Sequence, residues 1–95
     1  MAAAYWIAHV TVTDETAYAR YAALATGAIE AHGGEFLARG GRHRQMEGRD
    51  HPRNVVVRFP SLEDAVACYE SPAYRAALAE AQGAAERDLV IVEGL

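Results

Sequence analysis

The chain has 95 residues, of which 52% are apolar and 23% charged, an ordinary balance for one globular domain. Its net charge of −4 argues against a nucleic-acid-binding or membrane-surface protein, because both need a basic face. No apolar stretch approaches the roughly 20 residues that span a bilayer, and the N-terminal residues lack the basic segment of a signal peptide. The only cysteine, Cys68, cannot form an intrachain disulfide, so we expect a cytoplasmic protein.

The first third of the chain predicts a strand followed by a helix. Residues 4–12 (AYWIAHVTV) are rich in aromatic and β-branched side chains, which favour a strand. Thr13 or Asp14 should then cap a helix, because apolar side chains recur at helical spacing from there to His32. The glycine pair at 33–34 ends this helix, since glycine adopts the left-handed C-terminal conformation at little cost.

The remainder predicts two strands, an interrupted helix and a last strand. The expected elements are strands at 35–47 and 53–60, helical segments at 62–70 and 72–86, and a strand at 88–95. Ser61 and Ser71 are the expected N-caps, and Pro72 occupies the first helical position, where proline is favoured. A second glycine pair, at 40–41, weakens the strand in which it lies.

This order of elements is the ferredoxin-like, split βαβ pattern. We therefore expect a single α+β domain over residues 1–95, with a four-stranded antiparallel sheet. The helices should cover one face of the sheet, and a hairpin should join the second and third strands.

Alternate side chains of a strand lie on opposite faces of a sheet. One predicted face is wholly apolar: Trp6, Ala8, Val10, Val12, Phe36, Ala38, Val55, Val57, Phe59, Val90 and Val92. The other predicted face is mixed: Tyr5, Ile7, His9, Thr11, Leu37, Arg39, Val56, Arg58, Leu89, Ile91 and Glu93. The helices can cover only one face, for which the apolar set is better suited. We therefore expect a homodimer in which the two mixed faces pack together.

Four blocks of the chain, GGEFLARGG, VVVRFPSLEDA, YESPAYR and DLVIVEG, resemble the domain-of-unknown-function 1330 family, and the likeness covers nearly the whole chain. That family belongs to the dimeric α+β barrel superfamily, so the resemblance implies that two sheets pair into a barrel. Related superfamily members include cofactor-independent monooxygenases, small-lactone isomerases, haem enzymes and ligand-sensing domains. The resemblance therefore implies a fold and an assembly, but no single reaction.

Three polar side chains of the mixed face are candidate site residues. His9 lies in a strand expected at the sheet centre, where a histidine must find a hydrogen-bond partner or line a cavity. It is the candidate catalytic base. Arg39 and Arg58, if buried, need a carboxylate, a carbonyl or a bound anion. They are candidate ligand-binding residues, with an interface salt bridge, for instance to Glu93, as the alternative.

Two tyrosines of the predicted helices, Tyr18 and Tyr74, are further candidate ligand-binding residues. Tyr18, like Tyr21 and Tyr69, could line a cavity between helices and sheet, and Tyr74 could point at that pocket or at the partner chain. Tyrosines at helical spacing are more often core residues with a solvated hydroxyl. Ser71 is explained by its N-cap position rather than as a nucleophile, and Cys68 by its burial among alanines.

No metal or cofactor is expected. The four histidines lack the spacing of metal ligands, and no nucleotide-binding signature is present. His32 is explained as a helix cap, and His43 and His51 as solvated loop residues.

Three functions remain open. The first is a cofactor-independent enzyme of monooxygenase or isomerase type, with His9 as base and Arg39 holding an anionic substrate. The second is a non-catalytic binder of a small anionic or aromatic metabolite. The third is a structural dimer without a pocket. A structure without a cavity of about 300 Å³ that touches His9 or Arg39 would count against the two site hypotheses.

Overall fold

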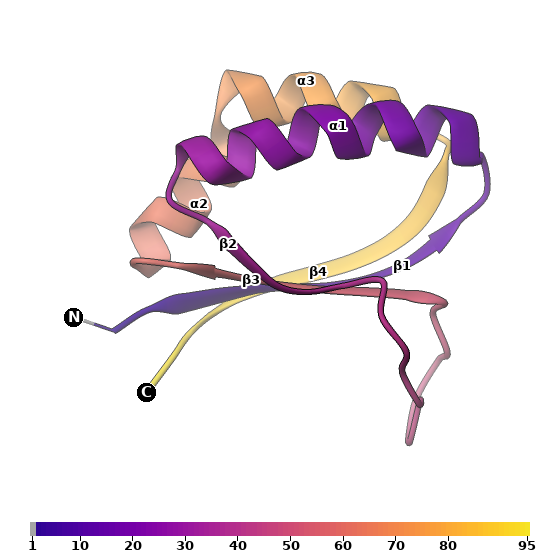
Figure 1. Cartoon of the computed structure of the whole chain (residues 1–95), viewed down its shortest axis with the longest axis horizontal. Coiled ribbons are helices and arrows are strands. Elements are labelled where there is room, and N and C mark those ends of the chain that lie inside the picture. Colours follow the sequence, from indigo (N-terminus) through magenta and orange to yellow (C-terminus); the bar gives the residue numbers. More distant parts are fainter. Residues whose placement is uncertain (1) are drawn as a thin grey trace.

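The computed structural model describes residues 2–95. The elements in chain order are β1 (Ala4–Val12), α1 (Glu15–Ala31), β2 (Glu35–Arg39), β3 (Arg53–Phe59), α2 (Leu62–Glu70), α3 (Pro72–Ala81) and β4 (Ala85–Glu93). The strands form one antiparallel sheet in the order β2-β3-β1-β4. The helices lie on one face of this sheet (Figure 1). The predicted ferredoxin-like fold is confirmed.

The helices begin at predicted caps. Asp14, Ser61 and Ser71 are the N-caps of α1, α2 and α3, and each side-chain oxygen accepts a hydrogen bond from the backbone N–H three residues on, at 3.1–3.2 Å. Pro72 is the first residue of α3, as expected. α3 ends at Ala81 rather than at Glu86, and Glu86 belongs to β4.

The register of β4 differs from the prediction. Ala8 pairs with Leu89, so Leu89 and Ile91 lie beneath the helices. Val90 and Val92 lie on the opposite face, where they are 54% and 46% exposed. The predicted faces of these four residues were therefore wrong, as was that of Glu93, which pairs with the inward-facing Ala4. Because positions 89–92 are all apolar, their pattern fits either register equally well.

The course of β2 also differs from the prediction. The strand ends at Arg39, and residues 40–52 form a largely exposed loop that projects away from the helices (Figure 1). Between Phe36 and Ala38 a bulge shifts the pairing with β3. As a result Ala38 faces away from the helices and Arg39, opposite Val55, faces toward them, the reverse of the expected arrangement.

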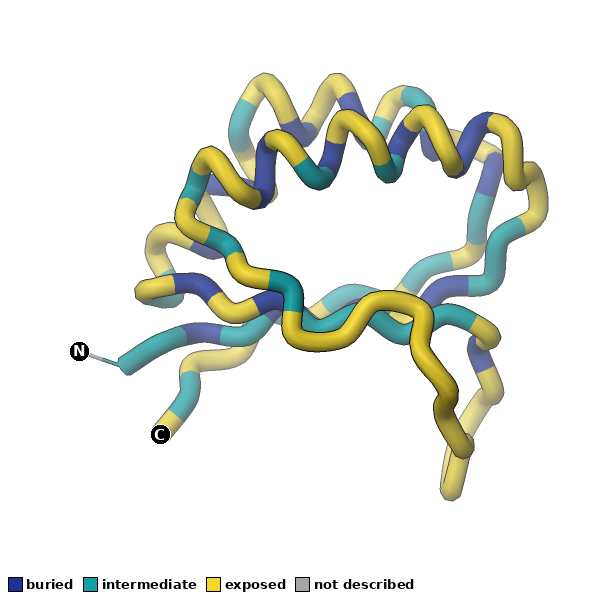
Figure 2. Tube along the Cα trace, viewed as in Figure 1, coloured by how far each residue is buried: buried dark blue, intermediate teal, exposed yellow. Residues whose placement is uncertain are grey.

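The core lies between the sheet and the helices, whose outward surfaces are exposed (Figure 2). Its largest fully buried side chains are Trp6, Tyr74, Phe59, Val10, Val57 and Cys68. Trp6 is at its centre and contacts the Tyr74 ring edge-on, with the ring centroids 4.9 Å apart. Within residues 2–95, no helix is both long and apolar enough to cross a membrane. The face of the sheet that carries no helix is called the outer face below.

Candidate functional site

A cavity of about 120 Å³ lies between α1 and the sheet. It is lined by side chains of the strands and of α1: Trp6, Ala8, Tyr18, Tyr21, Ala22, Ala25, Thr26, Ile29, Phe36, Arg39, Arg53, Val55, Val57 and Arg87. The cavity touches Arg39 but not His9, and it is smaller than the expected volume. A buried cavity of about 150 Å³ can hold benzene, so a one-ring ligand would fill this smaller, partly open cavity completely.

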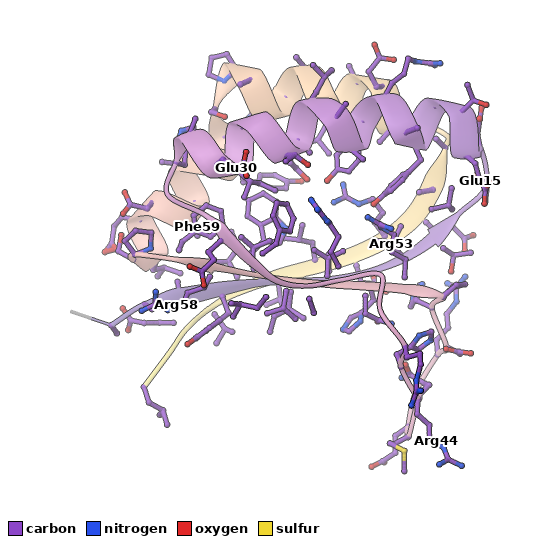
Figure 3. The ribbon with its side chains drawn as sticks, viewed as in Figure 1. Glu15, Glu30, Arg44, Arg53, Arg58 and Phe59 are labelled. Atoms are coloured by element: carbon purple, nitrogen blue, oxygen red, sulfur yellow. The ribbon has the colours of Figure 1, made fainter. Side chains whose placement is uncertain are left out.

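Three arginines reach this cavity, one each from β2, β3 and β4, and each lies against an aromatic ring. The guanidinium carbon is 4.4 Å from the Phe36 ring centroid for Arg39, 5.6 Å from that of Tyr18 for Arg53, and 4.8 Å from that of Tyr21 for Arg87. Figure 3 shows Arg53 between the sheet and α1, whereas Arg44 lies at the far end of the loop.

The three cations have no anionic partner. No aspartate or glutamate lines the cavity, and within residues 2–95 neither Arg39, Arg53 nor Arg87 forms an ion pair. The Nε atoms of Arg53 and Arg87 are buried without a hydrogen-bond partner. Buried donors without acceptors are costly, so this arrangement is typical of a site that receives an anion.

The sheet register places the arginines on two sides of the cavity. Val10 of β1 pairs with Arg53 of β3 on one side and with Arg87 of β4 on the other. Because neighbouring strands lie about 4.8 Å apart, the two Cα atoms are roughly 9–10 Å apart. Arg39 is opposite Val55, two residues along β3 from Arg53, so Arg39 and Arg53 share one side.

Gly40 makes room for Arg53. Its φ is +69°, a region that favours glycine. A Cβ atom added at Gly40 would lie 2.9 Å from Nη1 of Arg53. The backbone N–H of Gly40 also donates to the Asn54 carbonyl at 2.9 Å, which fixes the end of β2 beside β3. A glycine that ends the strand therefore also shapes the cavity wall.

Arg87 joins two buried tyrosines. Its Nη2 donates to the Tyr21 hydroxyl at 2.9 Å and to the Tyr74 hydroxyl at 3.1 Å, and the two hydroxyls are 2.5 Å apart. Burial raises the pKa of Tyr21 well above its ordinary value and also raises that of Tyr74. Burial acts to lower the pKa of Arg87, but the two phenols outweigh it and the pKa is raised. At neutral pH the cluster therefore contains two neutral phenols and one cation.

A family model described as a domain of unknown function, DUF1330, matches residues 3–95. The chain belongs to the DUF1330 family. No curated protein is a match for it.

Several solved structures have the same fold as this DUF1330 chain. A protein of unknown function from Rhodopseudomonas palustris has a TM-score of 0.80 at 20% identity, over 99% of this chain and 83% of its own. A dimeric ferredoxin-like protein of unknown function from Thermobifida fusca has a TM-score of 0.57 at 17% identity, over 98% and 92%. SnoaB, a cofactor-independent oxygenase from Streptomyces nogalater, has a TM-score of 0.55 at 13% identity, over 100% and 95%. At these identities the likeness shows the fold alone.

The predicted site residues of the DUF1330 chain fall into two groups. Arg39 and Tyr18 line the cavity, and Tyr74 lies behind it, in contact with Tyr21 and Arg87. His9 and Arg58 lie on the outer face, where both are exposed. The structure therefore separates the predicted base, His9, from the predicted anion-binding residue, Arg39. It also leaves Glu93 without an ion pair to either predicted arginine.

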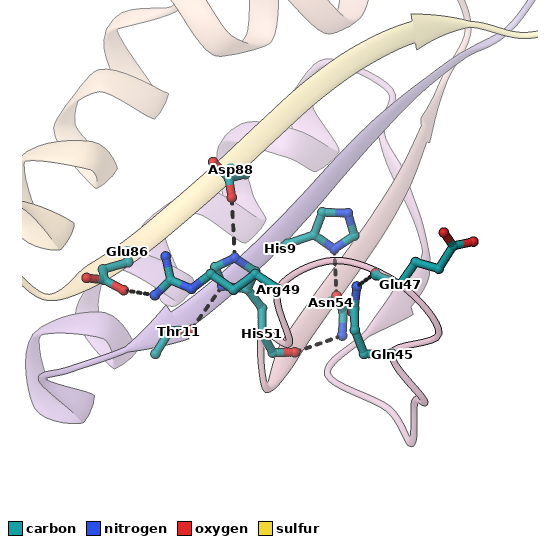
Figure 4. A network of polar contacts seen from close by, with 9 residues as sticks. All are labelled: His9, Thr11, Gln45, Glu47, Arg49, His51, Asn54, Glu86 and Asp88. Carbon is teal, nitrogen blue, oxygen red and sulfur yellow. Dashed lines mark hydrogen bonds and ion pairs between the residues drawn. The ribbon is translucent and has the colours of Figure 1, made fainter.

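His9 belongs to a polar network on the outer face (Figure 4). His9 Nδ1 is 2.6 Å from Oδ1 of Asn54, whose Nδ2 donates to the His51 carbonyl at 3.2 Å. His51 Nδ1 is 2.9 Å from Thr11 Oγ1, and its Nε2 is 3.3 Å from Asp88 Oδ2. His51 is 4% exposed, so the expectation of a solvated loop residue was wrong. Among residues 2–95, no three histidine, cysteine or acidic side chains are placed to hold a metal ion.

Outside the cavity, Ser71 and Cys68 carry side chains that can act as nucleophiles in enzymes, but both have structural roles here. Ser71 caps α3 and also donates its hydroxyl to the Cys68 carbonyl at 2.7 Å. Cys68 is fully buried, and burial raises the pKa of its thiol to about 11. The thiol therefore stays protonated at neutral pH and is a weak nucleophile, in agreement with the prediction.

Sequence reasoning missed two cavity arginines, Arg53 and Arg87. Arg87 lies two residues before Leu89, so the correct register of β4 would have placed it under the helices. Arg53 opens β3 on the same face as Val55 and Val57, which was a usable signal. Tyr21 lines the cavity, as its helical position allowed, whereas Tyr69 is not among the lining residues.

Proposed function

We propose that this DUF1330 protein binds a small, planar organic anion in the cavity between α1 and the sheet. The observation that carries this proposal is the convergence of Arg39, Arg53 and Arg87 on a cavity without an acidic side chain. Like charges held close together in a partly desolvated site repel one another, and a bound anion removes that cost. The rings of Tyr18 and Tyr21 line the cavity beside Arg53 and Arg87, so the site combines apolar surface with positive charge.

Isothermal titration calorimetry with benzoate and benzamide tests this proposal, because the two differ mainly in charge. We expect benzoate to bind at least about tenfold more tightly, since a hydrogen bond to a charged group contributes about 1.5–3 kcal/mol. Arg53→Gln and Arg87→Gln should each weaken benzoate binding. Arg44→Gln, the same charge change in the exposed loop, is the matched control. Equal affinity for both compounds, or no effect of either cavity substitution, would contradict the proposal.

We propose further that the functional unit is a homodimer paired through the outer faces. Ile7, Val56, Val90 and Val92 form an apolar group at the centre of that face, and the two β4 valines are about half exposed. Apolar surface of this kind is typical of an interface. The Thermobifida fusca protein with the same fold is dimeric.

A catalytic role without a bound cofactor is the second candidate, and the Tyr21–Tyr74–Arg87 cluster favours it. Fixed donors act most strongly on an oxygen that gains negative charge during a reaction. SnoaB, which has this fold, is a cofactor-independent oxygenase. The DUF1330 protein would then be an oxygenase or isomerase. His9 is not within the cavity lining, so its proposed role as base applies to a substrate bound on the outer face.

Turnover assays separate the candidates. We would incubate the protein with small β-keto acids and dihydroxybenzoates, and follow oxygen uptake and substrate loss. Turnover abolished by Arg87→Gln and retained in His9→Ala would support catalysis in the cavity. Turnover abolished by His9→Ala would place the chemistry on the outer face. Binding without conversion of any compound would leave the anion binder as the function.

A further inference from the structure

The hydroxyl hydrogens of Tyr21 and Tyr74 can be assigned from their surroundings. Tyr74 is 0% exposed, and within residues 2–95 its hydroxyl forms hydrogen bonds only with Tyr21 and Arg87. Arg87 is a donor, so the Tyr74 hydrogen has a single acceptor, the Tyr21 oxygen. The reverse assignment would bury an unsatisfied O–H group, which is costly. Tyr21 therefore accepts from Tyr74 and from Arg87, and both acceptor positions of its oxygen are occupied.

The hydroxyl hydrogen of Tyr21 is then free to donate to a ligand in the cavity. Tyr21 lines the cavity, and its hydroxyl has no other protein partner within the described residues. Arg87 lines the cavity beside it. The β4 side of the cavity thus presents an O–H donor next to a guanidinium cation, and both suit one oxygen that carries a partial or full negative charge.

The opposite side of the cavity is more strongly cationic. Arg39 and Arg53 both lie there, and neither has an ion-pair partner within residues 2–95. Two guanidinium groups match the two oxygens of a carboxylate better than a single phenol and a single guanidinium do. Phe36 and Tyr18, which lie under these arginines, leave space for a flat ring between the two sides.

We infer that the ligand is a one-ring aromatic acid with an oxygen substituent para to its carboxylate, of which 4-hydroxybenzoate is the simplest example. The carboxylate meets Arg39 and Arg53, and the para oxygen accepts from Tyr21 and Arg87. The para position follows because the two donor groups come from β3 and β4, with β1 between them. This inference rests on the proposed anion-binding function and specifies the ligand class of that same site.

The test compares benzoate with its 2-, 3- and 4-hydroxy derivatives by calorimetry on the full chain. We expect 4-hydroxybenzoate to bind about tenfold more tightly than benzoate, and the 2-hydroxy isomer to show no such gain. This gain is the dissociation constant of benzoate divided by that of 4-hydroxybenzoate, both measured on the same variant. A substitution that weakens the binding of both acids equally therefore leaves the gain unchanged. Tyr21→Phe should abolish the gain. Tyr74→Phe removes the same tyrosine–tyrosine hydrogen bond but keeps the cavity hydroxyl, and should retain most of the gain.

The outcomes distinguish this inference from the proposed function. If benzoate binds but the 4-hydroxy derivative shows no gain, the inference is overturned and anion binding stands. If the gain survives in Tyr21→Phe, or is lost equally in Tyr74→Phe, the hydrogen assignment is wrong. If none of the four acids binds, the proposed function falls as well.

Discussion

Arg87 shows how single residues define this site. It lies on β4, under α1 and α3, and its side chain spans the gap to a tyrosine from each helix. Two neutral phenols can orient a guanidinium but cannot neutralise it. The charge is therefore held in place and remains available to a ligand. A carboxylate in the place of either phenol would have produced an ordinary buried ion pair.

The buried phenols predict a loss of stability in alkali. Below about pH 10, tyrosine is neutral in both folded and unfolded chains, and the stability contribution of its neutral form is fully present. Above that pH the unfolded chain ionises while Tyr21, whose pKa is raised by burial, stays protonated, so the free energy of unfolding falls. Urea unfolding between pH 8 and 11 should show a fall that Tyr21→Phe reduces by about 1.4 kcal/mol in total, because only the last pH unit of this range lies above the pKa of an unfolded tyrosine. Identical slopes in both proteins would contradict this.

Replacing Arg53 should make the protein more stable but weaken its binding of benzoate. The Nε of Arg53 is buried without a partner, and no hydrogen bond is made by its side chain within the described residues. Arg53→Met keeps an unbranched apolar stem, removes the charge and removes the buried donor. We expect the free energy of unfolding of the ligand-free protein to rise by about 0.5–1 kcal/mol, because site residues often cost stability. Benzoate binding should weaken. A variant that is both less stable and binds benzoate normally would refute this role.

At the scale of elements, β2 and the loop after it determine which residues reach the cavity. The sequence predicted both glycine pairs as interruptions, and the structure agrees that Gly40 ends β2. It did not predict the bulge between Phe36 and Ala38, because a one-residue shift leaves the composition of the strand unchanged. That shift alone moves Arg39 from the outer face to the cavity.

Substitution of Gly40 should therefore affect both folding and binding. In Gly40→Ala, the positive φ is strained and the new Cβ meets Arg53 Nη1 at 2.9 Å. We expect a loss of about 1–2 kcal/mol in the free energy of unfolding and weaker benzoate binding. Gly41→Ala is the matched control, because a Cβ there meets nothing within 4 Å. Equal effects of the two substitutions in denaturation and calorimetry would argue against this role.

The last strand shows the other limit of sequence reasoning. A continuous apolar run predicts a strand but not its register, since both faces would be apolar. The signal that resolves the register is polar, because Glu86 and Asp88 face outward and are exposed while Arg87 faces inward. A prediction from polarity alone would have kept Arg87 off the face beneath the helices, because charged residues are rarely buried. Arg87 nevertheless lies there and lines the cavity.

At the scale of the whole molecule, the fold was predictable, whereas the cavity was predictable only in its general place and in some of its residues, such as Tyr18 and Arg39. The order of elements, the three N-caps and the antiparallel sheet follow from local patterns in the chain. The cavity depends on side chains from four strands and α1, whose relative positions are set by registers and by one bulge. Such positions arise from packing between distant segments, which a single sequence does not report.

The outer face predicts the assembly. Val90 is 54% exposed in the monomer and lies at the centre of the apolar group, so Val90→Glu should leave the fold intact but prevent dimer formation by burying an unpaired charge. Light scattering should give a dimer mass for the wild type and a monomer mass for the variant. Leu24→Glu is the matched control, because Leu24 is 47% exposed on the outward surface of α1. A monomeric wild type at micromolar concentration would contradict the proposed homodimer.

The most direct test of the central claim is to observe the arginines themselves. In ¹⁵N-labelled protein, the Nε–Hε resonances of Arg53 and Arg87 report on donors that have no partner in the ligand-free structure. We predict that benzoate shifts both resonances and that benzamide shifts neither. Shifts confined to loop arginines such as Arg42 and Arg44, or no shift at all, would contradict an anion site between α1 and the sheet.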